Sequence, residues 1–175
     1  MQGNFSVYLK NKKYKTRYRT EFITITDDVE EIVKKSGIKT GTIVIQTHHT
    51  TCGIWVNENE KNLIGPSEEI GYTSDLRKVL DNFADPASEY GHNDICHTQN
   101  ITGKRNTHLC EPDENGVINE CINGHAHAQA MMLQSSISLI VEDGKLLRGR
   151  WQEVLLVELD HDRERTVSFL VSGVL

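Results

Sequence analysis

The sequence predicts an α+β fold: a single compact domain with a largely antiparallel β-sheet and two or three helices. A chain of 175 residues has the length of one domain, which is expected to span residues 1–175. Short segments rich in β-branched residues alternate with segments of helical periodicity in the first half. The C-terminal part is a run of short apolar segments separated by turn signals, and strands joined by hairpins pair antiparallel.

The first half contains one expected helix and four expected strands. Asp27 or Asp28 is expected to cap a helix over residues 29–35, and Gly37 ends it. Acidic residues lie in its first turn and lysines in its last, as the helix dipole favours. The strands are expected over residues 5–9, 22–26, 41–47 and 53–57.

The second half begins with an amphipathic helix over residues 67–83, which Asp85-Pro86 ends. Residues 84–122 are polar and rich in Gly, Asn and Asp, and they include a long loop insertion at about 95–122. Asn123 is expected to cap a helix over 125–134. The last strands are expected over residues 137–141, 145–148, 151–159 and 166–171, the first two joined by a hairpin turn at Asp143-Gly144.

Composition argues against several classes of function. The net charge of −6 and the pI near 5.7 argue against nucleic-acid binding. The basic run Lys10–Arg19 is interpreted as a solvated strand or arm that protects a sheet edge. The first residues lack the apolar core of a signal peptide, and no apolar run approaches the roughly 18 residues of a membrane helix. A cytoplasmic protein without membrane contact is expected, with thiols rather than disulfides.

Seven of the eight histidines fall between residues 48 and 127, in segments that do not look like plain core. His49, His92 and His127 are the candidates to meet in one site, because a catalytic zinc typically has three protein ligands and one open position. Zinc is the simplest match to imidazole, and Mg²⁺ is the alternative divalent metal for phosphate chemistry. The other interpretation is that these histidines only form hydrogen bonds in the core or at an interface.

Within each pair of neighbouring histidines, the two side chains are expected to point in different directions because of their positions in a strand or a helix. Strand alternation places His49 on the face of Ile43 and Ile45 and His48 on the opposite face, so only one of them faces a given pocket while the strand continues. His125 and His127 diverge by roughly 200° on a helix, so only one of these is expected in the site, and His127 is the choice.

Carboxylates and anion-binding groups complete the candidate site. Glu58 and Asp94 are candidates to transfer protons or orient ligands, and a solvent-exposed turn carboxylate is the alternative for Glu58. The candidates for binding phosphate or other substrate groups are Thr50, Thr51, Asn57, Arg150 and Gln152.

The four cysteines give weaker signals. Cys52, beside the first histidine pair, is either a nucleophile or, as we favour, a small packed thiol. Cys96, His97, His108, Cys110 and Cys121 lie in one irregular segment, which suggests a structural zinc site or a loop of scattered thiols.

These residues resemble the YjbQ family, also called secondary thiamine-phosphate synthases. The resemblance covers nearly the whole chain from the second strand onward, and residues 136–154 are its most specific part. The chain departs from the family pattern at Gly149-Arg150-Trp151-Gln152, where Thr commonly replaces Arg, and in its long link over 95–122. It also departs at His125-Ala126-His127, where the family commonly has Pro-Ala-His. The chain is identified as a long-loop variant with the Asn-Gly-His-Ala-His form. The matching motifs are His49-Thr50-Thr51-Cys52-Gly53 with Asn57-Glu58, His92-Asn93-Asp94, Asn123-Gly124-His125-Ala126-His127, and Ser136, Leu139, Val141, Gly144, Gly149, Trp151 and Gln152.

The resemblance implies a homotrimer with the matching histidines in a cleft at or near subunit interfaces. It implies a weak, secondary activity that joins hydroxymethylpyrimidine diphosphate to thiazole phosphate, so a phosphorylated small molecule is the expected partner. Two other functions fit the same residues: a metal-dependent hydrolase of a small molecule, and a non-catalytic trimeric protein that binds a metal or ligand.

Overall fold

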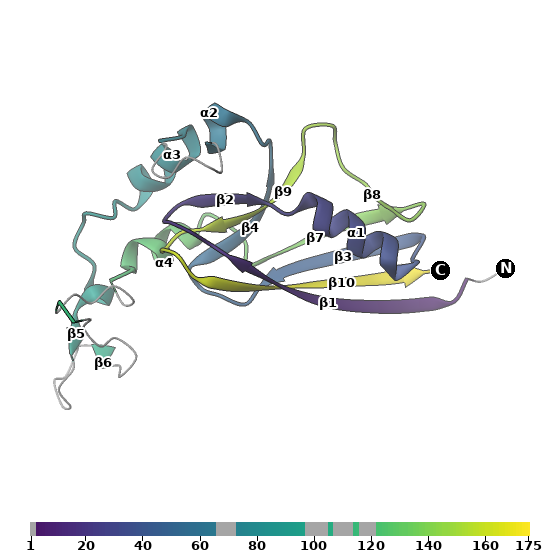
Figure 1. Cartoon of the computed structure of the whole chain (residues 1–175), viewed down its shortest axis with the longest axis horizontal. Coiled ribbons are helices and arrows are strands. Elements are labelled where there is room, and N and C mark those ends of the chain that lie inside the picture. The colour runs from purple at the N-terminus through teal and green to yellow at the C-terminus, as the bar shows by residue number, and fades with distance from the viewer. Residues whose placement is uncertain (1–2, 66–72, 97–104, 107–113, 116–121) are drawn as a thin grey trace.

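A five-stranded antiparallel sheet forms the long side of the molecule (Figure 1). The computed structural model describes residues 3–65, 73–96, 105–106, 114–115 and 122–175. Buried and outward-facing residues alternate along β10, as they must when one face of a sheet packs on a core. The strand order is β1 (Phe5–Lys15), β10 (Glu164–Val174), β3 (Thr40–Thr47), β7 (Ser136–Glu142) and β8 (Lys145–Leu146).

The edge strand β1 confirms one interpretation of the sequence. It extends through most of the basic run Lys10–Arg19, so these lysines line a sheet edge. The hairpin turn between β7 and β8 is also confirmed. Asp143 and Gly144 both have positive φ, 51° and 74°, which is the type I′ geometry that suits a two-residue hairpin.

A second, three-stranded antiparallel sheet packs on the first. Its order is β2 (Glu21–Thr24), β9 (Glu153–Glu158) and β4 (Cys52–Asn57). The central strand β9 reads Glu-Val-Leu-Leu-Val-Glu without alternation, because both of its faces are covered. Val154 and Leu156 pack into the core between the sheets, whereas Leu155 and Val157 pack toward the helices.

Helix α1 (Thr26–Ser36) closes the core between the sheets with Val29, Ile32 and Val33. Its predicted end is confirmed, since Gly37 adopts the left-handed conformation with φ 72°. The predicted cap is wrong: the N-cap residue is Ile25, and neither Asp27 nor Asp28 makes a capping hydrogen bond. Asp28 instead accepts hydrogen bonds from Lys12 and Tyr14 of β1, at 2.5 and 2.6 Å, because the helix lies against that strand.

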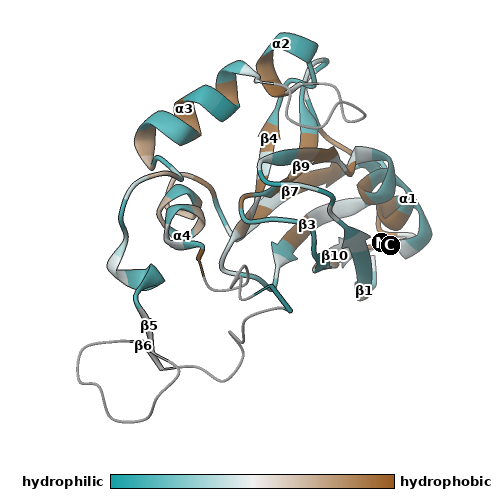
Figure 2. Ribbon diagram, turned by 60° about the vertical axis from the view of Figure 1, so that its left-hand side comes forward, coloured by the Kyte–Doolittle hydropathy of each residue, from teal (hydrophilic) through white to brown (hydrophobic). Residues whose placement is uncertain are grey.

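Three further helices lie beside the outer face of the small sheet (Figure 2): α2 (Lys61–Ile64), α3 (Asp75–Phe83) and α4 (Gly124–Ala130). They contribute Ile64, Leu80 and Ala126 to a second apolar cluster. The helix predicted over 67–83 is partly confirmed. In the described residues it begins at Asp75, where Ser74 provides the cap, and 67–72 lie outside the described residues.

Several predicted boundaries and one predicted loop need correction. The strand predicted over 5–9 continues to Lys15, and the strand predicted over 22–26 ends at Thr24 because α1 begins at Thr26. The helix predicted over 125–134 ends at Ala130, and the strand predicted over 151–159 begins at Glu153. The stretch 84–122, predicted as irregular, contains a short 3-10 helix η1 (Gly91–Asn93) and a parallel pair, β5 (Ile95–Cys96) and β6 (Arg105–Asn106). The α+β class with largely antiparallel sheets is confirmed. Among the described residues, no helix is long and apolar enough to cross a membrane.

Candidate functional site

A cavity of about 270 Å³ lies where one end of both sheets meets the start of α4. Strand β3 ends beside the start of β10 in the large sheet, and β9 of the small sheet leads into β10. The turn after β3 and the segment between β9 and β10 therefore meet there, together with the first residues of α4. We call this cavity the histidine–arginine pocket. It is lined by His48, His49, Thr50, Thr51, Asn123, His127, Asp160, Arg163 and Arg165.

Both histidines of the first pair line the histidine–arginine pocket. Strand β3 ends at Thr47, so the alternation that would separate His48 from His49 no longer applies. His48 is exposed, and its Nε2 lies 2.7 Å from Ser168 Oγ. His49 is half-buried, and its Nε2 accepts a hydrogen bond from the Thr166 backbone N–H at 2.9 Å. A neutral imidazole that accepts at Nε2 carries its proton on Nδ1.

The pKa of His49 lies below the ordinary histidine value. Burial is the main cause, and the nearby Arg165 guanidinium adds to it because it repels a charged imidazole. His49 is therefore neutral near pH 7.

His127 is the pocket-lining member of the second pair, as the helical spacing predicted. His92 packs against it with a ring-centroid distance of 4.4 Å and an interplanar angle of 61°. Asn93 Oδ1 accepts a hydrogen bond from Gly124 N at 2.9 Å, which fixes the segment of His92 on the start of α4. A Cβ on Gly124 would lie 2.5 Å from Tyr90 Cβ, so this close approach requires glycine.

His125 lies on the buried side of α4, only 6% exposed. Burial lowers its pKa, and the Arg19 charge lowers it further. Its Nε2 has no hydrogen-bond partner among the described residues. His125 therefore belongs to the packing beneath the pocket and not to its wall.

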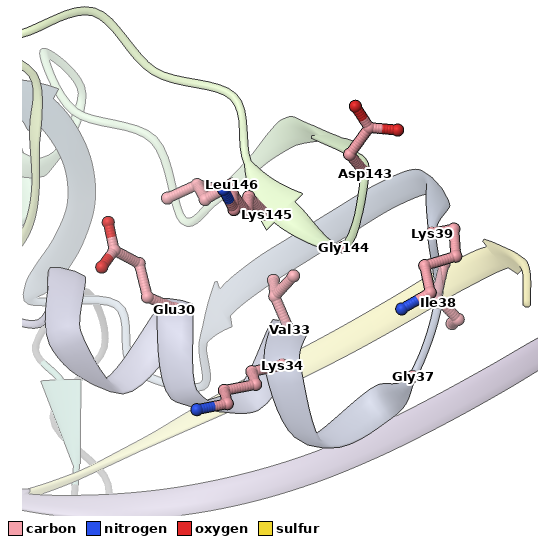
Figure 3. A pocket seen from close by; sticks show the side chains of 10 residues that line it. All are labelled: Glu30, Val33, Lys34, Gly37, Ile38, Lys39, Asp143, Gly144, Lys145 and Leu146. Atoms are coloured by element: carbon pink, nitrogen blue, oxygen red, sulfur yellow. The ribbon is translucent and has the colours of Figure 1, made fainter.

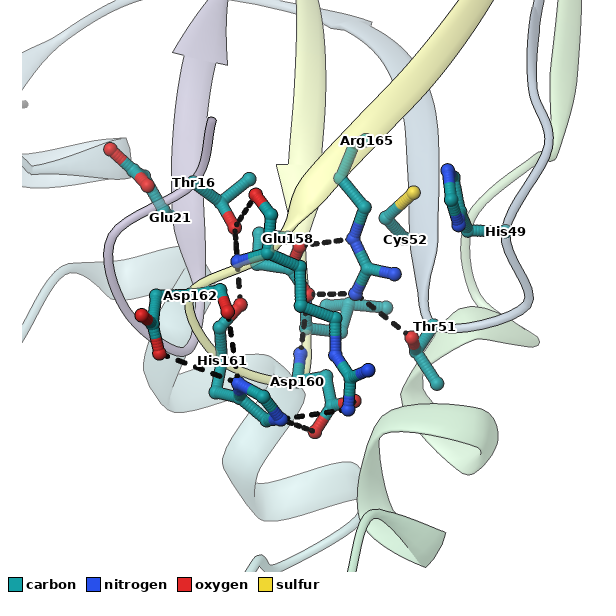
Figure 4. A network of polar contacts seen from close by, with 12 residues as sticks. Thr16, Glu21, His49, Thr51, Cys52, Glu158, Asp160, His161, Asp162 and Arg165 are labelled. Carbon is teal, nitrogen blue, oxygen red and sulfur yellow. Dashed lines mark hydrogen bonds and ion pairs between the residues drawn. The ribbon is translucent and has the colours of Figure 1, made fainter. Parts of the chain in front are cut away.

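A buried ion pair forms the back of the pocket (Figure 4). Arg165 donates from Nε and Nη2 to the two carboxylate oxygens of Glu158, each at 2.5 Å. Glu158 is 0% exposed and also accepts the backbone N–H groups of Leu159 and Asp160 at 3.1 and 2.8 Å. Arg165 Nη2 donates further to Thr51 Oγ1 at 3.0 Å, which fixes the turn that carries His49. Burial alone would lower the pKa of Arg165, but the Glu158 carboxylate outweighs it and raises the pKa.

A second acid–base cluster lies beside this pair. The Asp160 carboxylate receives Arg163 Nη2 and Asn123 Nδ2 on the same oxygen, both at 2.9 Å. His161 Nε2 lies 2.7 Å from Arg163 Nη2. The segment between β9 and β10 is thereby held against the start of α4.

Sequence reasoning missed Glu158, Asp160, Arg163 and Arg165. A signal was present: six charged or titratable residues follow one another over residues 160–165, directly after the apolar strand 154–157. Polar groups concentrated at the end of a buried strand are typical of a site.

Four predicted substrate or catalytic residues lie at the opposite end of the small sheet. Asn57 pairs with Glu153, at the far end of β4 and β9 from the pocket. Six residues of extended strand span about 17 Å, so Glu58 does not reach the pocket of its own chain. Gln152 accepts a hydrogen bond from Gly149 N at 2.7 Å, and the Arg150 guanidinium lies 4.9 Å above the Trp151 ring. The expectation that these residues join the histidines is wrong within one chain, because strand length separates them.

Asp94 also lies outside the pocket walls. It lines a neighbouring cavity of about 610 Å³ with Tyr90, Gly91 and Asn93. Asp94 directly follows the segment that carries His92, but it does not line the histidine–arginine pocket.

The predicted three-histidine zinc site does not fit this arrangement. No three His, Cys, Asp or Glu side chains among the described residues are grouped closely enough to hold a metal ion. The Nε2 of His49 accepts a hydrogen bond from Thr166, and the nearest carboxylates, Glu158 and Asp160, are in ion pairs with arginines. The binding of zinc or Mg²⁺ by this chain stays a prediction.

Cys52 is packed beneath the pocket at 3% exposure, with its Sγ 2.8 Å from Thr47 Oγ1. Burial raises the pKa of its thiol to about 11, so Cys52 is protonated near neutral pH, which fits a packed thiol rather than a nucleophile. The predicted second zinc site over Cys96–Cys121 rests on His97, His108, Cys110 and Cys121, which lie outside the described residues.

The family model described as UPF0047 protein YjbQ-like matches residues 10–174 of the chain. The chain belongs to the YjbQ family. A YbjQ-like protein of unknown function from Sulfolobus solfataricus P2 is 32% identical, with a TM-score of 0.75 and coverage of 97% of this chain and 99% of that one. The UPF0047 protein of Methanothermobacter thermautotrophicus is 28% identical, with 95% of this chain and 93% of that protein covered. For the UPF0047 protein YugU of Bacillus subtilis the identity is 28%, and the coverage is 94% and 99%.

The family resemblance drawn from the sequence is thus confirmed, and so is the fold it implied. The name of the Sulfolobus relative states no activity. The chemistry of this YjbQ protein must therefore be argued from its own pocket.

Replacing Glu158 by Gln is expected to lower the free energy of unfolding by about 3–5 kcal/mol, because Arg165 is then left buried without a counter-charge. Urea unfolding measures this. The matched control is Glu164→Gln at the start of β10, which removes the exposed Lys13–Glu164 pair and should change stability by less than about 1 kcal/mol. An equal loss of stability in Glu158→Gln and Glu164→Gln would contradict the conclusion that the buried Glu158–Arg165 pair stabilises the fold more than the exposed Lys13–Glu164 pair. The double variant Glu158→Leu, Arg165→Met should recover most of the loss.

The lowered pKa of His125 makes stability depend on pH. The unfolded chain binds a proton near pH 6.5, whereas the folded chain resists it, so stability should fall as the pH drops below about 6.5. His125→Asn should flatten this loss between about pH 7 and pH 5, and the exposed His48→Asn should not. Thermal unfolding across this range tests it, and a His125→Asn variant as acid-sensitive as the parent would contradict it. The pKa of His49 is lowered too, so His49 accounts for part of any dependence of stability on pH that remains in the His125→Asn variant.

Proposed function

We propose that this YjbQ protein is an enzyme that binds a phosphorylated small molecule in the histidine–arginine pocket. The reaction is group transfer of the thiamine-phosphate-synthase type, present as a weak, secondary activity. One observation carries the proposal: three imidazoles and two guanidinium groups line a single cavity of about 270 Å³. Phosphate oxygens are the ligands that such a donor set binds best.

The ion pairs at the back of the pocket favour anion binding because they orient the arginines. Glu158 and Thr51 engage Nε and Nη2 of Arg165, so the guanidinium is held in one position. Its Nη1 makes no hydrogen bond with a described residue and remains for a ligand. Fixed donors lose little entropy when a substrate binds.

The histidines supply two different functions. His49, neutral and with its proton on Nδ1, can donate a hydrogen bond to an anionic oxygen. His127 lies in the pocket with the His92 ring packed against it, so its imidazole can exchange a proton with a bound substrate. Imidazole is the side chain that most often transfers protons at neutral pH.

The proposed reaction is a substitution at the methylene carbon of hydroxymethylpyrimidine diphosphate. The thiazole nitrogen forms a bond to that carbon, and the bond from carbon to the diphosphate oxygen breaks. The departing diphosphate takes the electron pair, so negative charge grows on its oxygens. Arg163, Arg165 and the His49 N–H would stabilise that charge, as preorganised donors do in other enzymes.

Arg163→Gln is expected to weaken the binding of inorganic diphosphate by about tenfold or more, because a charged donor to phosphate is lost. Calorimetry measures binding, and release of diphosphate from the two substrates measures turnover. The matched control is Lys78→Gln, an exposed cation on α3 that does not line the pocket, which should change neither. An equal loss in both variants, or no diphosphate binding by the parent protein, would refute the proposal.

The same assay separates the alternatives. Release of diphosphate without the thiazole substrate would indicate a hydrolase. Tight binding without turnover would indicate a binding protein. Each reaction is run with and without added Zn²⁺ or Mg²⁺, beside metal analysis of the purified protein. About one metal per chain would support the zinc prediction.

We also propose a homotrimer, as the resemblance implies. The outer face of the five-stranded sheet supports an assembly because it carries exposed apolar side chains that none of the described residues covers. Exposed apolar patches of this kind mark interfaces. The residues are Phe5 (71% exposed), Val7 (56%), Leu9 (61%), Ile140 (55%) and Val174 (37%).

Leu9→Lys on this face is expected to shift the protein from trimer to monomer, because it places a charge in an apolar contact. Sedimentation equilibrium gives the mass. Phe83→Lys is the control, since Phe83 is also exposed (52%) but lies on α3, away from this face. A monomeric parent protein, or a trimer that withstands the Leu9 substitution, would contradict the proposal.

A further inference from the structure

A second cavity, of about 530 Å³, lies between the C-terminal half of α1 and the β7–β8 hairpin (Figure 3). It shares no lining residue with the histidine–arginine pocket. We call it the lysine groove. Its apolar part is formed by Val33, Ile38 and Leu146, and three lysines, Lys34, Lys39 and Lys145, stand around it.

The charge of the lysine groove is opposite to that of the whole chain. None of the three lysines makes an ion pair with a described residue. Two carboxylates also line the groove. Glu30 is engaged by Arg148 Nε at 3.0 Å, and the Asp143 carboxylate is turned away from the cavity in Figure 3. A chain with a net charge of −6 thus presents a concave surface with three unneutralised ammonium groups.

Lys39 is held in place by the turn of the β7–β8 hairpin. Gly144, in its left-handed turn conformation, donates its N–H to the Lys39 carbonyl at 3.0 Å. A Cβ on Gly144 would lie 3.5 Å from Lys39 Cδ and 3.6 Å from Nζ, so the lysine side chain packs along the turn. The ammonium group is therefore placed at the groove by the hairpin that forms its wall.

We propose that the lysine groove is a binding site for a small organic anion, an acyl or aryl carboxylate or phosphate, separate from the histidine–arginine pocket. The apolar residues would contact the body of the ligand, and the lysines would bind its charged end. The volume falls in the range of small-molecule sites, about 300–1,000 Å³. Unpaired ammonium groups beside an apolar surface favour an anion over a neutral or cationic ligand. The proposal does not depend on the function assigned to the other pocket.

The test uses the full-length, ¹⁵N-labelled protein and sodium octanoate as the probe, with octanol at the same concentration as the uncharged control. Saturable shifts of the Gly37 and Gly144 amide signals are expected with octanoate and not with octanol. Lys39→Glu with Lys145→Glu should raise the dissociation constant by about tenfold or more, because attraction becomes repulsion. Lys10→Glu, an exposed lysine of β1 with no ion pair to a described residue, is the matched control and should bind like the parent.

The variant spectra show directly whether the fold is kept, since folded amide signals remain dispersed. If the double variant does not fold, Lys145→Gln alone replaces it and should still weaken binding. The proposal is overturned by any of three results. These are no saturable shift at Gly37 and Gly144, an equal response to octanol, or shifts that map to His49 and His127 instead.

Discussion

The buried pair of Glu158 and Arg165 holds the two sheets together at the end that carries the histidine–arginine pocket. Glu158 ends the central strand of the small sheet, and Arg165 lies at the start of β10 in the large sheet. The pair therefore ties the two sheets at the corner where the pocket opens. Burying two charges costs free energy, and only a complete set of hydrogen bonds offsets that cost. Glu158 has such a set, with two bonds from Arg165 and two from backbone N–H groups.

The same pair sets the chemistry around it. Arg165 holds Thr51 in place. Burial, with a further contribution from the Arg165 charge, lowers the pKa of His49, so the first histidine segment is both positioned and kept neutral. On the other side, Asp160 binds Arg163 and Asn123 and fixes the start of α4, from which His127 reaches the pocket. The pocket walls are thus connected by hydrogen bonds through two carboxylates. Neither carboxylate was a candidate in the sequence.

A second group of predicted site residues lies far from the histidine–arginine pocket. Asn57, Glu58 and Gln152 belong to the matching family motifs, and together with Arg150 they lie at the other end of β4 and β9. The length of an extended strand keeps the two sets apart within one chain. The lysine groove lies on α1 and the hairpin, outside both sets.

The sequence alone determined the fold class, most strands, the end of α1 at Gly37 and the Asp143-Gly144 hairpin. Each follows from local rules, such as alternation, β-branching or the positive φ that glycine permits. It also selected His127 over His125, because helical spacing separates them. Tertiary structure alone decided which predicted site residues meet. Whether Glu58 reaches His49 depends on strand length and direction, and whether Arg165 faces Glu158 depends on how the two sheets pack. Local patterns carry no information on either, because both distances run through space and not along the chain.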